Sequence, residues 1–156
     1  AMDARRGLGL LGGGAHFYNV YETADGQCLA VGAIEPQFYH TFLREAGLDD
    51  PDFEHQWDRS RWPRLRQKVA ARLKERTRAE WLETFGSEAC VTPVLALSEV
   101  EEHSHLSARQ VFLRDGNVLQ PAPGPRFSRT PADSLRPATG ETAEAVLKDW
   151  AAGQPA

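Results

Sequence analysis

The sequence predicts an α+β fold: a small domain of short antiparallel strands, hairpins and several helices, followed by an extended proline-rich arm and a terminal helix. Three observations lead to this prediction. Short aromatic and β-branched runs are separated by turn residues, which is typical of strands. Other segments carry apolar residues at helical spacing. Hydrophobic residues make up 41% of the 156 residues, which is enough for one core.

The first predicted element is a β-hairpin. Residues 17–23 are aromatic and β-branched, and residues 27–34 form a second apolar run. The turn between them, residues 24–26, ends in Gly26, which can adopt a positive φ. The two runs are therefore predicted to pair as antiparallel strands.

The next segments carry signals for two helices separated by a loop. Pro36 suits the first position of a helix, and Gly47 suits the left-handed position after its last turn. Residues 48–56 are acidic and irregular, which predicts a loop. Ser60 is predicted to cap a second helix. The apolar stripe of that helix consists of Trp62, Leu65, Val69 and Leu73.

A third helix and a third strand are predicted next. Thr77 and Glu80 form a T-x-x-E capping box, in which each side chain can bond the backbone N–H of the other residue. The helix that follows ends at Gly86. Residues 90–95 have the composition of a short strand, and Pro93 within it indicates an edge position or a bulge.

One more short helix and a second hairpin complete the predicted domain. Ser98 and Glu101 form a second capping box, which predicts that a short helix begins there. Residues 110–114 and 117–120 flank an Asp-Gly turn, which predicts a hairpin.

The chain is interpreted as four parts. Residues 1–10 are a linker with an expression remnant at its start, and residues 11–120 are the α+β domain. Residues 121–137 contain five prolines and little periodicity, so an extended arm is expected. Residues 138–156 carry the terminal helix. The arm is long for a self-contained domain, so we expect it to cross another part of a larger protein.

Composition excludes several classes of protein. The 18 basic and 22 acidic residues give a net charge of −4, which argues against a nucleic-acid partner. No run approaches the ~20 apolar residues of a membrane span. Two cysteines do not make a disulfide framework, so a reducing, cytoplasmic location is expected.

Two clusters of residues are ambiguous. Five glycines lie within residues 7–14, but a strand follows them, whereas a phosphate-binding loop precedes a helix. They form either a flexible lead-in loop or a close backbone approach to a ligand. His103 and His105 stand next to two glutamates, but no third ligand lies at a recognisable spacing. No metal site is therefore predicted.

Glu35 is the most informative carboxylate. It follows the second apolar strand and directly precedes the helix that Pro36 opens. A carboxylate there can cap the helix and interact with the positive end of its dipole. It can equally be presented at the strand end to orient a base or accept a proton. The spacing alone leaves both readings open.

Three runs carry a resemblance to a known family: LGGGAHFY at 11–18, TADG at 23–26 and VGAIEPQFY at 31–39. Similar segments occur at 79–81, 89–95, 121–123 and 127–130. In order and spacing these segments resemble the α-methylacyl-CoA racemases of the class III CoA-transferase superfamily. The likeness covers about residues 11–130, and the string GAIEPQFY resembles racemases more than transferases.

The resemblance implies roles for four residues. Glu35 matches the family's glutamate that pairs with a catalytic histidine and orients it. Ile34, Gly13 and Gly14 match positions near the acyl group of the substrate. A carboxylate beside an imidazole selects its tautomer and favours its charged form. The chain departs from the family at His16, where a proline is common.

The resemblance also implies that these residues are one part of a longer enzyme. Family chains are more than twice as long, and their N-terminal large domain holds most of the CoA site and the catalytic His and Asp. Two family chains interlock, so each active site lies between a large and a small domain. The family inverts the α-carbon of 2-methylacyl-CoA thioesters through an enolate. CoA is part of the substrate, and no cofactor or metal is expected.

From this resemblance we expect the isolated chain to be inactive, because its proton-transfer partners lie in the large domain. Two alternatives remain open at this point. In the first alternative, the chain is the small domain of a class III CoA transferase. In the second, it is a stand-alone interaction module whose arm and terminal helix bind a partner.

Overall fold

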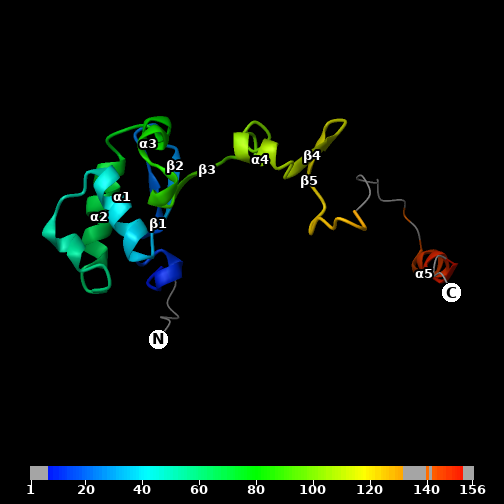
Figure 1. Ribbon diagram of the computed structural model, residues 1–156, viewed down its shortest axis with the longest axis horizontal. Helices are drawn as coiled ribbons and strands as arrows, with labels where there is room; N and C mark the ends of the chain where they lie inside the picture. The colour runs from blue at the N-terminus through cyan, green and yellow to red at the C-terminus, as the bar shows by residue number, and fades with distance from the viewer. Residues whose placement is uncertain (1–6, 132–139, 141, 153–156) are drawn as a thin grey trace. The chain divides into compact units, whose positions relative to one another are not determined.

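The computed structural model describes residues 7–131, 140 and 142–152. The chain divides into two compact units, residues 1–96 and residues 97–156, which are described separately (Figure 1). Most of the predicted linker at 1–10 and the last part of the predicted arm at 121–137 lie outside the described residues.

The first unit contains a three-stranded antiparallel sheet in the order β1-β2-β3. Its strands are β1 (Tyr18–Glu22), β2 (Cys28–Gly32) and β3 (Val91–Val94). The predicted hairpin is confirmed, because β1 pairs with β2 and Gly26 has a φ of 76°. Pro93 lies in the edge strand β3, as predicted. The backbone N–H of Gly32 donates to the carbonyl of Cys90, so the backbone N–H and C=O groups of residues 90, 92 and 94 point toward β2. The backbone groups of the residues between them, including the Pro93 nitrogen, point away from the sheet.

Three helices accompany this sheet: α1 (Pro36–Ala46), α2 (Trp62–Leu73) and α3 (Arg78–Thr84). Pro36 opens α1, and Gly47 follows its last turn with a φ of 65°, as predicted. The capping box of Thr77 and Glu80 at the start of α3 is confirmed. In this unit α2 contacts β1, and α3 contacts β3.

One local prediction in this unit is refined and another is wrong. The segment 48–56 contains a 3-10 turn, η2 (Pro51–Glu54), because the carboxylate of Asp50 accepts the backbone N–H of Asp52. Ser60 does not cap α2, whose N-cap is Arg61. The Ser60 hydroxyl and backbone N–H both donate to the carboxylate of Asp58 instead.

The core of the first unit lies against one face of the sheet. Tyr21 on β1 and Leu29 and Val31 on β2 point to this face and are buried. They belong to one cluster with the buried sides of the helices, including Phe42 of α1 and Trp81 of α3. Two further 3-10 turns border the unit, η1 (Leu10–Gly12) and η3 (Ser87–Ala89).

The second unit contains α4 (Ser104–Ala108), the hairpin strands β4 (Phe112–Asp115) and β5 (Val118–Pro121), and α5 (Ala143–Ala152). The hairpin prediction is confirmed. The helix predicted to begin at Ser98 is wrong, because α4 begins at Ser104. The carboxylate of Glu101 binds Arg114 of β4 and does not form a capping box.

The terminal helix predicted within residues 138–156 is present as α5. Its apolar side chains are largely exposed, with Leu147 at 63% and Trp150 at 70%. Within the described ranges, no helix combines the length and the hydropathy that crossing a membrane requires.

Candidate functional site

The four predicted site residues border the same end of the three-stranded sheet. Tyr18, at the start of β1, lies opposite Gly32, at the end of β2. Gly13 and Gly14 precede Tyr18 by a few residues, while Ile34 and Glu35 follow Gly32 directly. Antiparallel pairing therefore places the start of β1 beside the end of β2, which the two segments with the predicted residues adjoin in the sequence.

Glu35 is the N-cap residue of α1, with an extended backbone (φ −70°, ψ 142°). Its carbonyl accepts the N–H of Tyr39 at 2.9 Å, which is the first bond of the helix. Its side chain makes no capping hydrogen bond and is exposed. The side-chain cap considered from the sequence is thus not formed. The carboxylate stands at the positive end of the helix dipole with its oxygens available to another group.

Ile34 links β2 to Glu35 and is partly buried against the core. Its N–H bonds the carbonyl of Gly32 at 3.0 Å. Its own carbonyl accepts the side-chain amide of Gln56 at 2.8 Å. The backbone that leads into Glu35 is therefore held by hydrogen bonds on both sides of Ile34.

The glycine loop needs glycine for two local reasons. Gly13 has a φ of 84°, and its carbonyl accepts bonds from Asn19 and from Arg66, each at 2.9 Å. Gly14 is buried, and a Cβ there would lie 2.6 Å from the backbone of Leu8. Of the two readings of this loop, the structure shows a close backbone approach, but the approaching group is the chain itself.

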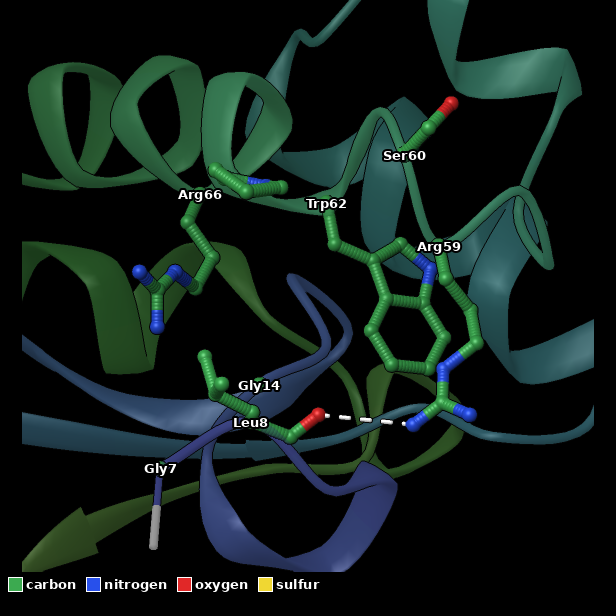
Figure 2. Close-up of a pocket in the computed structure, with 8 residues that line it drawn as sticks. Gly7, Leu8, Gly14, Arg59, Ser60, Trp62 and Arg66 are labelled. Atoms are coloured by element: carbon green, nitrogen blue, oxygen red, sulfur yellow. Dashed lines mark hydrogen bonds between the residues drawn. The ribbon is translucent and has the colours of Figure 1, made fainter. Parts of the chain in front are cut away.

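A pocket of about 390 Å³ lies between this loop and the start of α2. Figure 2 shows the residues that line it. Gly14 lines it, together with Arg59, Trp62 and Arg66. The Arg59 guanidinium lies 5.3 Å from the centre of the Trp62 ring, and one of its nitrogens is 3.5 Å from the Leu8 carbonyl oxygen. Two guanidinium groups thus make the wall of this pocket positive.

The other basic residues near the start of α2 are neutralised locally. Arg61 and Arg64 form ion pairs with Asp52, and Lys68 pairs with both Asp50 and Asp52. These contacts lower the pKa of Asp52, first through the hydrogen bond from Lys68.

Cys90 is a residue near the site that sequence reasoning missed, because an isolated cysteine in a short strand carries no motif. It has a positive φ of 50°, and its carbonyl accepts the N–H of Gly32 at 2.9 Å. Burial raises the pKa of its thiol, and the negative charges of Glu35 and Glu88 raise it further. The thiol therefore lies within electrostatic range of the Glu35 carboxylate and stays protonated at neutral pH.

His16, at the end of the glycine loop, is fully buried and not a surface residue. Its Nε2 lies 2.7 Å from the hydroxyl oxygen of Tyr39. Burial lowers the pKa of His16 to about 4, so this side chain is neutral near pH 7. It belongs to the core beneath the loop.

The two histidines considered as metal ligands in the sequence lie in the second unit. His103 is the N-cap of α4, and His105 lies within that helix. In the described part of the chain, no group of three or more His, Cys, Asp or Glu side chains gathers as a metal site would require.

Comparison with known proteins identifies the family. The family model described as CoA-transferase family III matches residues 2–142. The chain belongs to CoA-transferase family III. Among curated relatives, this family III chain is similar to alpha-methylacyl-CoA racemase of Mus musculus, with 43% identity over 96% of the chain. It is also similar to alpha-methylacyl-CoA racemase of Homo sapiens, with 41% identity over 95% of the chain.

The family III chain spans about 40% of the length of these two relatives. A CaiB/baiF CoA-transferase family protein of Caenorhabditis elegans is 30% identical over 75% of the chain and 33% of that relative. Among solved structures, Rv3272 from M. tuberculosis matches with a TM-score of 0.61 and 16% identity. That match covers 75% of this chain and 35% of the other, and at this identity it supports the fold alone.

Proposed function

We propose that this chain is the small domain of an α-methylacyl-CoA racemase, and that the whole protein inverts the α-carbon of 2-methylacyl-CoA thioesters. The observation that carries the proposal is the identity of 43% and 41% to two racemases over nearly the whole chain. The uncapped carboxylate of Glu35 at the sheet end is the chemical feature that fits this reaction.

The reaction needs two proton-transfer groups on opposite faces of the α-carbon and donors for the enolate oxygen. In our proposal Glu35 accepts a hydrogen bond from a histidine of the large domain. That bond selects the histidine's tautomer and stabilises its charged form as the proton is taken up. Glu35 is thus a positioning residue in this scheme, because it acts through the histidine.

The remaining predicted residues would face the acyl part of the substrate. Ile34 offers a partly buried apolar side chain next to Glu35. Gly13 and Gly14 carry no side chains of their own, and Gly14 lines the pocket beside the loop, where a substrate can approach the backbone closely. We propose these three as substrate-binding residues.

We further propose that the whole protein works as a cytoplasmic homodimer in fatty acid metabolism, with acyl-CoA as its substrate. The chemistry moves protons and no electrons, so the proposed reaction needs neither a metal nor a redox cofactor. CoA enters as part of the substrate. No nucleic-acid partner is proposed, given the net charge of −4.

The test is exchange of the α-proton of a 2-methylacyl-CoA in deuterated water. The protein made from the complete gene is expected to incorporate deuterium and to equalise the two epimers, and the 156-residue chain alone is expected to do neither. Sustained exchange by the chain alone would overturn the assignment of the proton-transfer groups to a large domain. A complete gene that encodes only these residues would favour the stand-alone module.

The second candidate is a CoA transferase, which the family description and the C. elegans relative favour. Such an enzyme would pass CoA between two acids through covalent intermediates on an aspartate of the large domain. Ping-pong exchange of CoA between two carboxylic acids, without epimerisation, would establish this activity and exclude the racemase proposal.

A further inference from the structure

The side chain of Gln56 holds the peptide bond that leads into Glu35. Its Nε2 lies 2.8 Å from the carbonyl oxygen of Ile34 and 3.4 Å from that of Ala33. The residue is buried, with 7% of its surface exposed. A buried amide that donates to one carbonyl at ideal distance is a specific contact and not a surface coincidence.

The contact acts on the residue before Glu35. The carbonyl of Ile34 and the N–H of Glu35 belong to one rigid peptide plane. On the other side, the Glu35 carbonyl is held by the N–H of Tyr39 in the first turn of α1. The backbone of Glu35 is therefore held from both directions, although its carboxylate makes no capping bond. The first turn of α1 holds the carbonyl side of Glu35, and Gln56 holds the peptide on its N–H side.

Gln56 is itself anchored in the core. Its main-chain carbonyl accepts the indole N–H of Trp62 at 2.8 Å, and Trp62 is 4% exposed. The preceding turn η2 is held through the carbonyl of Phe53, which accepts the hydroxyl of Tyr39 at 2.9 Å. The backbone that carries the Gln56 side chain is thus held in place, so its amide can keep the position of the peptide it binds.

We propose that Gln56 is a positioning residue for the reaction: it sets the direction of the Glu35 carboxylate by holding the Ile34–Glu35 peptide. This inference rests on the proposed racemase function. It differs from a purely structural role, in which Gln56 would only satisfy two buried carbonyl groups. The two roles predict different behaviour when Glu35 is also changed.

The experiment uses the complete gene product and the variant Gln56→Met, which keeps the length of the side chain and removes its donors. We expect kcat for α-proton exchange to fall about 10- to 100-fold with little change in KM, because a misdirected Glu35 carboxylate misplaces the proton-transferring histidine and slows the chemical step. Gln67→Met is the matched control, since Gln67 is exposed on α2. It is expected to behave like the unchanged protein.

A double variant separates positioning from stability. If Gln56 acts through Glu35, adding Gln56→Met to Glu35→Gln is expected to lower kcat no further than Glu35→Gln alone. If the double variant has a kcat lowered by the product of the two single-variant factors, the proposal is overturned. It is also overturned if Gln56→Met has the same kcat as the Gln67→Met control. Loss of exchange in the unchanged protein would instead contradict the proposed function itself.

A second variant covers the case in which Gln56→Met does not fold. Trp62→Phe keeps the ring in the core and removes the N–H that holds the Gln56 carbonyl. We expect a smaller fall in kcat in the same direction, again absent when Glu35 is already Gln. An unchanged kcat in a folded Trp62→Phe protein would overturn the positioning chain from Trp62 through Gln56 to Glu35.

Discussion

The Nε2 atom of His16 lies 2.7 Å from the hydroxyl oxygen of Tyr39, in the interior of the first unit. The Tyr39 hydroxyl donates its only hydrogen to the carbonyl of Phe53 at 2.9 Å. Nε2 must therefore carry the hydrogen in the contact between the two rings. The other ring nitrogen, Nδ1, is buried and has no hydrogen-bond partner among the described residues.

This geometry predicts that acid destabilises the first unit through His16. Burial lowers the pKa of His16 from 6.5 to about 4. Between these two values His16 is protonated in the unfolded chain and neutral in the folded chain. The contribution is complete above pH 6.5 and is lost as the pH falls toward 4. The free energy of unfolding should drop by on the order of 3 kcal/mol over this range.

Urea denaturation of the 156-residue chain at several pH values measures this effect. His16→Gln, which cannot titrate, should show a flatter dependence between pH 6.5 and 5, whatever its stability at neutral pH. His40→Gln is the control, because His40 is exposed. If the free energy of unfolding of His16→Gln depended on pH as steeply as that of the unchanged chain, burial of a neutral His16 would not be the cause of the pH dependence.

Gly14→Ala should destabilise the chain. The added Cβ would lie 2.6 Å from the Leu8 carbonyl carbon and oxygen, which are backbone atoms that cannot rotate away. Overpacking of this kind costs about 1–3 kcal/mol. Gly12→Ala is the matched control, because its nearest neighbour would lie at 3.7 Å. Denaturant midpoints of the two variants compare them directly, and equal midpoints would contradict the close approach at Gly14.

Thr77→Ala should destabilise α3 by about 1 kcal/mol, because it removes one half of a capping box. The Glu80 N–H bonds the Thr77 hydroxyl at 3.3 Å, and the Glu80 carboxylate accepts the Thr77 N–H at 2.8 Å. Thr77→Ser keeps the hydroxyl and should retain most of the stability. The measurement is thermal unfolding of both variants, and equal losses would show that the hydroxyl is not responsible.

Glu35→Gln in the complete gene product should lower kcat for α-proton exchange roughly 10²- to 10⁴-fold, since a neutral amide cannot stabilise the charged histidine. The unfolding of the 156-residue chain should hardly change, because the Glu35 side chain makes no capping bond. Glu83→Gln, an exposed change on α3, serves as the control for activity. Full activity of Glu35→Gln would remove this residue from the mechanism.

Local signals allowed much of the fold to be predicted from the sequence. Pro36 and Gly47 mark the start and the end of α1. Both do so through their own backbone angles, which do not depend on distant residues. The placement of Glu35 between β2 and α1 followed from the same signals.

The errors came from contacts that the local pattern does not contain. Ser98 and Glu101 have the spacing of a capping box, but Glu101 binds Arg114, which lies 13 residues away in a hairpin. Ser60 was displaced as a cap because Asp58 accepts its hydrogen bonds. The link from Gln56 to Ile34 joins residues 22 positions apart and carries no periodic or motif signal.

The outward direction of the Pro93 nitrogen affects how this small sheet meets other proteins. An exposed edge strand normally offers a row of free N–H groups that can recruit a strand from another molecule, the first step of aggregation. Beyond Val91, the next outward position of β3 is proline, so it has no N–H to donate. The four-residue edge formed by β3 is therefore a poor template, which disfavours growth of this three-stranded sheet by intermolecular addition on the β3 side.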